Sequence, residues 1–215
     1  MKTPLLTVIS DPVCPWCFIG KNRLDNAINS LPANINLDVH WSPFELNPTI
    51  PKSGMNRDDY LRIKFGSTHA ASKVYDNISL AACEDGLILN LDSITRTPNT
   101  RDAHKLILYS RKLGTQDKLV HNLFKAYLID SLDIGDFDTL AQIAKQSGIT
   151  TKEATSILLN NDLHSEIDSL EEKATEMGIR GVPAFLYNDR YLFSGAQSVQ
   201  TMKLSIIKAF DKNLS

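Results

Sequence analysis

The sequence predicts a mixed α/β protein in which a long helical segment is inserted into a β-sheet. Strand patterns occur near the two ends of the chain, and helical patterns fill the middle, from about residue 49 to 164. The expected order is strand, helix, strand, many helices, helix, strand, strand, helix. A length of 215 residues suits one large domain, or one domain that carries a sizeable insertion.

The N-terminal part predicts a strand–helix–strand unit. Residues 5–10 (LLTVIS) are rich in β-forming side chains and are followed by Asp11–Pro12, which indicates a buried strand. Apolar residues at helical spacing then run from Pro15 to about Ser30. Residues 35–41 alternate between apolar and polar side chains, as expected for a half-buried strand.

Long amphipathic patterns predict the helices of the middle segment. Thr97–Pro98 is expected to begin one helix, with the proline in its first turn. Residues 118–132 and 137–147 each carry an apolar stripe. Thr150 and Glu153 have the spacing of a capping box at the start of a further helix.

The last fifty residues return to mixed character. A helix is expected to end at Gly178, and a final helix is expected from about Ser198 to Phe210. Between them, residues 184–193 (AFLYNDRYLF) read as two strands joined by a tight turn at Asn188–Asp189.

Two cysteines three positions apart follow the first strand. If a helix begins at Pro15, Cys14 is its N-cap, where free backbone N–H groups and the helix dipole favour a thiolate over a thiol. Cys17 then lies on the same helix face, within reach of a disulfide. One exposed, activated sulfur and one more buried sulfur are the parts that thiol–disulfide exchange needs.

A zinc site and a pair of inert core cysteines are the alternatives to this redox site. Tetrahedral zinc needs two further ligands at comparable spacing. Cys83 stands alone, and no two of the histidines, at positions 40, 69, 104, 121 and 164, are three to five residues apart. We therefore expect no bound metal.

Composition excludes several classes of partner. Hydrophobic residues make up 42% and charged residues 22%, and the formal net charge is −2, so nothing favours a nucleic acid or an anionic membrane surface. The N-terminal stretch lacks the apolar run of a secretory signal. A cytoplasmic location is expected, where a close pair of thiols indicates redox or metal chemistry.

Four segments together resemble the DsbA-like branch of the thioredoxin superfamily, and in particular its FrnE-like proteins and the related 2-hydroxychromene-2-carboxylate isomerases and kappa-class glutathione transferases. They are SDPVCPWCFIGK, FELNP, NTRDAHKLI and GVPAFLYNDRYLFSGAQS. The resemblance implies a thioredoxin fold with a large all-helical insertion between the second and third strands. Residues 1–48 and 165–215 would form the thioredoxin-like domain, and residues 49–164 the insertion.

The resemblance also implies roles for residues outside the cysteine pair. Pro183 is expected to be cis and to lie against the cysteines, with the backbone of Val182 offered to a substrate. Trp16, between the cysteines, would contact the substrate or glutathione. His104 is either a helix-surface residue or a group beside the cysteine pair. Cys83 is expected to be a small buried hydrophobe, with a third redox thiol as the alternative.

Three functions are compatible with these features. The leading hypothesis is a thiol–disulfide oxidoreductase that acts on disulfide- or thiol-bearing proteins or small molecules through Cys14 as nucleophile and Cys17 as resolving thiol. It needs no tightly bound cofactor, and glutathione is a candidate cosubstrate. A glutathione-dependent isomerase or transferase is the first alternative, although such relatives usually have serine in place of Cys14. A holdase-like binding protein is the second, and the oligomeric state stays open.

Overall fold

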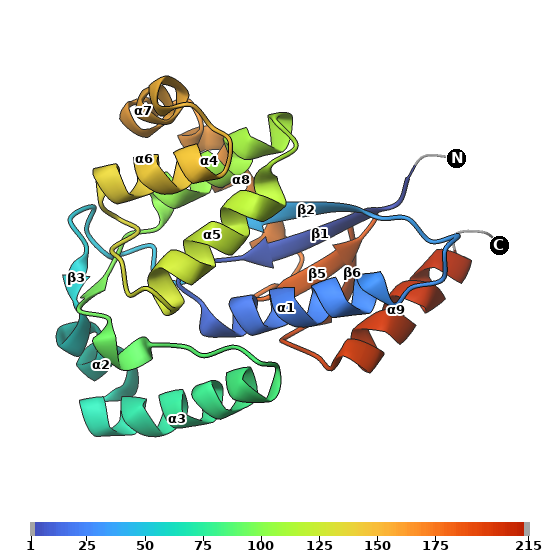
Figure 1. Ribbon diagram of the computed structural model, residues 1–215, viewed down its shortest axis with the longest axis horizontal. Coiled ribbons are helices and arrows are strands. Elements are labelled where there is room, and N and C mark those ends of the chain that lie inside the picture. Colours follow the sequence, from blue (N-terminus) through green and yellow to red (C-terminus); the bar gives the residue numbers. More distant parts are fainter. Residues whose placement is uncertain (1–2, 213–215) are drawn as a thin grey trace.

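A four-stranded mixed sheet is formed by strands from the two ends of the chain. The computed structural model describes residues 3–212, with the sheet order β2–β1–β5–β6 (Figure 1). The strands are β1 (Leu5–Ser10), β2 (Asp38–Pro43), β5 (Ala184–Tyr187) and β6 (Arg190–Ser194). β1 runs parallel to β2 and antiparallel to β5, and β5 runs antiparallel to β6.

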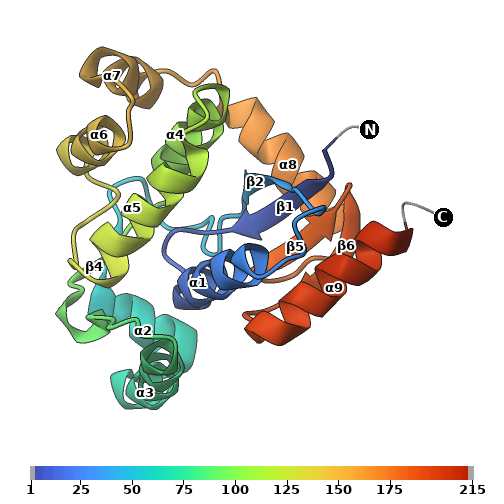
Figure 2. The same cartoon turned by 45° about the vertical axis from the view of Figure 1, so that its right-hand side comes forward.

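Helices cover both faces of this sheet. Helices α1 (Pro15–Asn29) and α9 (Val199–Lys212) lie side by side on one face, and α8 (His164–Glu176) lies on the other (Figure 2). Successive side chains of a strand point to opposite faces. Accordingly, Val8 packs in the core under α1, and its neighbour Ile9 packs in the smaller cluster under α8.

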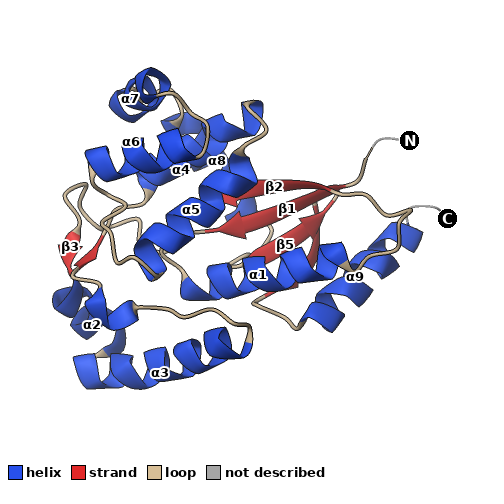
Figure 3. Cartoon of the chain, in the orientation of Figure 1, coloured by secondary structure: helices blue, strands red, loops and turns tan. Residues whose placement is uncertain are grey.

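The chain between β2 and α8 forms the insertion, which is mostly helical (Figure 3). Its elements are β3 (Met55–Asn56), α2 (Arg57–Phe65), α3 (Thr68–Glu84), the 3₁₀ turn η1 (Leu91–Ser93), β4 (Arg96–Thr97), α4 (Arg101–Lys112), α5 (Gln116–Leu128), α6 (Phe137–Gln146) and α7 (Thr151–Leu159). The fold class is thus confirmed, with one correction. The insertion is not wholly helical, because β3 and β4 form a two-residue antiparallel pair.

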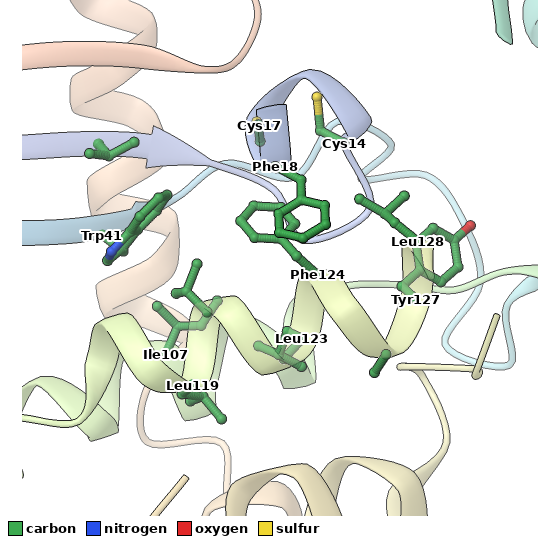
Figure 4. Close-up of a cluster of buried hydrophobic side chains, with 14 of the residues drawn as sticks. Cys14, Cys17, Phe18, Trp41, Ile107, Leu119, Leu123, Phe124, Tyr127 and Leu128 are labelled. Carbon is green, nitrogen blue, oxygen red and sulfur yellow. The ribbon is translucent and has the colours of Figure 1, made fainter. Parts of the chain in front are cut away.

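The insertion shares its hydrophobic core with the sheet. Phe124 of α5 stacks on Phe18 of α1, with ring centroids 5.3 Å apart, and meets the edge of Trp41 of β2 at 6.3 Å (Figure 4). All three side chains belong to one buried cluster. The division into residues 1–48, 165–215 and 49–164 stays a prediction, but the core runs across those boundaries.

Gln116, the first residue of α5, completes the hydrogen bonding of β2. Its side-chain oxygen accepts from the Trp41 N–H (2.9 Å), and its side-chain nitrogen donates to the Trp41 carbonyl (3.0 Å). β2 is an edge strand of the sheet, so these backbone groups lack a strand partner on that side. The amide of Gln116 takes the place of a neighbouring strand, which fixes α5 against the sheet.

Several local predictions are confirmed and one is wrong. The first strand covers residues 5–10 as expected, and Thr150 and Glu153 form both hydrogen bonds of a capping box. The helix expected at Thr97–Pro98 instead begins at Arg101, because Thr97 belongs to β4. Within residues 3–212, none of the helices combines the length and apolar character that crossing a bilayer requires.

Candidate active site

The turn between β1 and α1 presents Cys14 at the N-terminus of the helix. Cys14 has extended backbone angles (φ −88°, ψ 113°), and its carbonyl accepts from the N–H groups of Cys17 (3.0 Å) and Phe18 (3.3 Å). Pro15 occupies the first helical position, where the missing N–H has no intrahelical partner to lose. The predicted N-cap position of Cys14 is confirmed.

The two cysteines carry free thiols in unlike surroundings. Cys14 is 5% exposed and Cys17 is 1% exposed, so the expectation of an exposed nucleophile is wrong, although Cys14 is the more accessible of the pair. Burial raises the pKa of the Cys17 thiol well above its ordinary value, and its hydrogen bond with the Cys14 sulfur raises it further. Cys17 therefore holds its proton, and the Cys14 sulfur points away from the buried aromatic side chains (Figure 4).

The loop before β5 closes over Cys14. The Val182–Pro183 peptide bond is cis, as predicted. The Cys14 sulfur donates to the Val182 carbonyl at 3.7 Å, which accounts for the burial of Cys14. A Cβ added to Gly20 would lie 3.1 Å from Cγ of Pro183, so glycine at this position permits α1 to approach the loop closely.

Trp16 stands at the rim of this site. It is 37% exposed, as expected for an aromatic side chain that a substrate can contact, and Val182 is half-buried. A groove of about 470 Å³ runs along the same loop, lined by Arg180, Val182, Pro183 and Tyr191 among others.

His104 lies beneath the cysteine loop rather than on a helix surface. It is 1% exposed, and its Nε2 is 3.8 Å from Oδ1 of Asp11, which is itself fully buried. Burial and the nearby Arg101 lower the pKa of His104 to about 3. The predicted contact of His104 with a substrate stays a prediction, since the imidazole faces Asp11.

Asp11 is the residue of this region that sequence reasoning missed. Its carboxylate accepts from the backbone N–H groups of Leu46 (2.8 Å) and Val13 (3.3 Å), and its carbonyl accepts from the Cys14 N–H (3.0 Å). Burial raises the pKa of Asp11 to about 7, although the hydrogen bonds from Leu46 and Val13 act to lower it. The sequence feature that could have indicated a role for Asp11 is the position of an acidic residue between a buried strand and a cysteine pair.

Cys83 is exposed near the end of α3, so its expected role as a buried hydrophobe is wrong. It lies on the solvent side of the helix, whereas its neighbour Ala82 is fully buried. Across the described residues, no three His, Cys, Asp or Glu side chains gather in a way that could hold a metal ion.

The family model of the DSBA-like thioredoxin domain matches residues 6–206. The chain belongs to this family. The match runs from β1 into α9 and includes the cysteine pair, the insertion and the cis-proline loop. The suspected DsbA-like relationship is therefore confirmed, and thiol–disulfide oxidoreduction or related isomerase or transferase chemistry is the activity that this family membership supports.

Solved structures of DsbA-like proteins resemble the chain over nearly its whole length. A probable DsbA oxidoreductase from Streptomyces coelicolor is 25% identical, with a TM-score of 0.89 over 97% of this chain and 91% of that one. A 2-hydroxychromene-2-carboxylate isomerase (14% identity, TM-score 0.73) matches over 98% of both chains. The cytosolic disulfide reductase DsbM from Pseudomonas aeruginosa (15% identity, TM-score 0.66) matches over 98% of this chain and 100% of that one. At these lower identities the likeness concerns the fold.

Proposed function

We propose that this protein is a thiol–disulfide oxidoreductase that works through the Cys14–Cys17 pair. The observation that carries the proposal is the asymmetry of the two thiols. Cys14 lies at the N-terminus of α1 against the Val182 carbonyl, and Cys17 lies behind it with its pKa raised by burial. Such a pair suits nucleophilic attack by the first sulfur and resolution by the second.

The reaction divides between the two sulfurs. The Cys14 thiolate attacks one sulfur of a substrate disulfide, and the other substrate sulfur leaves and takes up a proton. Cys17 then gives up its proton and attacks the Cys14 sulfur, which releases the second substrate thiol and forms the Cys14–Cys17 disulfide. The substrate gains two electrons and two protons, and two glutathione molecules can restore the dithiol as they form glutathione disulfide.

The loop of Val182 and Pro183 would dock the substrate. A substrate strand can pair with the Val182 backbone while Trp16 covers its side chains. Proteins and small molecules that carry a disulfide are the proposed substrates. The cytosolic assignment of the related DsbM supports a cytoplasmic location, where a glutathione pool favours reduction of substrate disulfides.

Reduction of insulin with glutathione as donor tests this proposal. We expect Cys14→Ser to lower the rate to that of glutathione alone, and Cys17→Ser to accumulate a mixed disulfide, because the resolving thiol is gone. Cys83→Ser is the matched control, since it removes an exposed thiol far along the sequence from the motif and should keep the rate. A Cys14→Ser variant with the original rate would contradict the proposal.

The second thiol argues against the isomerase alternative. An isomerase that only activates glutathione has no use for a resolving cysteine, which would compete by forming a disulfide. Glutathione-dependent isomerisation of a 2-hydroxychromene-2-carboxylate that survives alkylation of Cys14 would favour the isomerase instead.

A further inference from the structure

The insertion holds a buried guanidinium that has no acidic partner. Arg57, the first residue of α2, is 7% exposed. It donates to hydroxyl groups of Tyr75 (2.6 Å), Thr97 (3.0 Å) and Tyr127 (3.3 Å), and its Nε has no hydrogen-bond partner. Among the residues that the structure describes, no carboxylate lies at salt-bridge distance from it.

The other buried cations of the described chain differ from Arg57 in this respect. Lys21 pairs with Asp25 and Asp117, each at 2.9 Å, and Lys105 pairs with Asp102 at 2.6 Å. Burial of a charge is costly unless an opposite charge or several hydrogen bonds offset it. Arg57 has no counter-ion, and its three hydrogen bonds to hydroxyl groups offset the cost of burial without cancelling its charge.

Aromatic rings and hydroxyls hold the charge of Arg57 without neutralising it. The guanidinium carbon lies 5.3 Å from the ring centroids of both Tyr60 and Tyr75. A ring face attracts a cation through its quadrupole but carries no net charge. Burial raises the pKa of Tyr75 to about 12, so its hydroxyl also stays neutral. The positive field of Arg57 thus extends into the surrounding interior.

The part of the insertion that carries this cluster lies next to the helix whose N-cap is Cys14. Helix α3, which carries Tyr75, packs against α1, and the α2–α3 pair lies beside the N-terminal end of α1 (Figures 1 and 2). Tyr75 accepts a hydrogen bond from Arg57 (2.6 Å), and its pKa is raised mainly by burial and further by negative charge on Tyr60 and Cys14. Tyr127, a further hydrogen-bond partner of Arg57, belongs to the same buried cluster as Cys14 (Figure 4).

We propose that Arg57, acting through Tyr75, is a positioning residue by which the insertion stabilises the Cys14 thiolate. The inference rests on the proposed function, in which Cys14 is the nucleophile. The N-terminus of α1 supplies one positive contribution, and Arg57 supplies a second from a different part of the chain. The insertion would then tune the reactivity of the cysteine pair as well as cover it.

Alkylation of Cys14 by iodoacetamide as a function of pH tests this proposal. The chain has three cysteines, so Cys17→Ser and Cys83→Ser leave Cys14 as the single thiol. In this background we expect Arg57→Gln to move the midpoint of the alkylation profile about one pH unit upward, with about tenfold less thiolate well below the midpoint. Arg57→Lys, which keeps the charge, should restore most of the original profile.

A second variant separates the electrostatic role from a structural one. Tyr75→Phe keeps the ring and removes the hydroxyl that accepts a hydrogen bond from Arg57, so a smaller upward shift of the same midpoint is expected. A folded Arg57→Gln variant with an unchanged midpoint would overturn the proposal. If Arg57→Gln does not fold, an unchanged midpoint in Tyr75→Phe overturns it instead.

The reduction potential gives an independent measurement in the chain that keeps both Cys14 and Cys17. Loss of thiolate stabilisation destabilises the reduced state, so Arg57→Gln should have a more negative potential, by about 30 mV for a tenfold change in the equilibrium constant. The rate of alkylation depends on the charge of Cys14 and does not require catalytic turnover. A shifted midpoint in a chain that fails to reduce insulin would therefore support the role of Arg57 while it contradicts the proposed function.

Discussion

Asp11 and His104 lie together in the interior, and burial moves their pKa values in opposite directions. The pKa of Asp11 rises from 3.8 to about 7, and that of His104 falls from 6.5 to about 3. Over most of the acidic range the folded pair thus holds one proton, on the carboxyl group. The unfolded pair also holds one proton between these ordinary values, on the imidazole.

The signs of the two contributions to stability are opposite. A carboxyl group with a raised pKa contributes stability that is lost as the pH rises through its folded value. An imidazole with a lowered pKa contributes stability that is lost as the pH falls from its unfolded value towards its folded value. Between about pH 4 and pH 6.5 the effects of Asp11 and His104 cancel, so the pair adds no pH dependence to unfolding.

Single substitutions should reveal the separate contributions of Asp11 and His104 to the pH dependence of unfolding. We expect the stability of His104→Gln to fall as the pH rises from about 4 to about 7, because Asp11 alone then loses its proton on unfolding. The stability of Asp11→Asn should rise with pH over about the same range. Each slope should differ from that of the unmodified protein by about 1.4 kcal/mol per pH unit.

Urea unfolding at a series of pH values measures these slopes. The unmodified protein is the control, because it contains every other titrating group. Parallel pH profiles for the unmodified protein and both variants would show that Asp11 and His104 are not coupled through burial.

At the scale of elements, the contact of α1 with the cis-proline loop sets the geometry of the site. Sequence alone would favour alanine at Gly20, since glycine inside a helix costs about 1 kcal/mol relative to alanine. The structure reverses this expectation, because the added carbon would lie 3.1 Å from Cγ of Pro183. That loop provides the Val182 carbonyl next to the Cys14 sulfur.

We therefore expect Gly20→Ala to gain no stability and to lose activity. Displacement of the loop should cost about 1–3 kcal/mol, which offsets the gain in helix propensity, and should slow insulin reduction. Gly181→Ala is the matched control for stability, because its added carbon meets nothing within 4 Å. Thermal unfolding and the insulin assay measure the two effects. A more stable Gly20→Ala variant with full activity would refute the importance of this contact.

Elements with strong local signals were predictable, and those that depend on distant partners were not. The turn at Asn188–Asp189 and the capping box at Thr150 are determined by side chains a few residues apart, and both are confirmed. The pairing of β3 with β4 joins residues about forty positions apart and involves two residues on each side. A pair of two-residue strands is too short to show an alternating pattern, so the Thr97–Pro98 sequence predicts a helix start instead.

At the scale of the whole molecule, the same distinction separates the predicted site residues from the missed ones. Cys14, Cys17 and Pro183 belong to short motifs with their own chemistry, which the sequence displays. Arg57 and Asp11 acquire their properties through burial among residues from other segments, such as Tyr75 and Leu46. An ionisable residue in sequence is expected at the surface, so only the assembled fold reveals that these two side chains are buried.

One core joins the insertion to the sheet, and the protein should therefore unfold as a unit. Phe124 is fully buried, and its ring lies between Phe18 of α1 and Trp41 of β2. Far-ultraviolet circular dichroism reports mainly on the helices of the insertion. The fluorescence of Trp41 reports on the sheet, provided that Trp16, the other tryptophan of the chain, is replaced by phenylalanine.

In the Trp16→Phe background we expect the two signals to give one coincident urea transition. Phe124→Ala should lower the free energy of unfolding by about 3–5 kcal/mol and move both signals together, because the cavity opens in the shared core. Phe137→Ala is the matched control, since Phe137 is 39% exposed on α6 and should have a much smaller effect. Loss of the helical signal at a lower urea concentration than the Trp41 signal would show that the insertion unfolds independently. In that case Arg57 could influence Cys14 only while the insertion and the sheet, two separately stable parts, are docked.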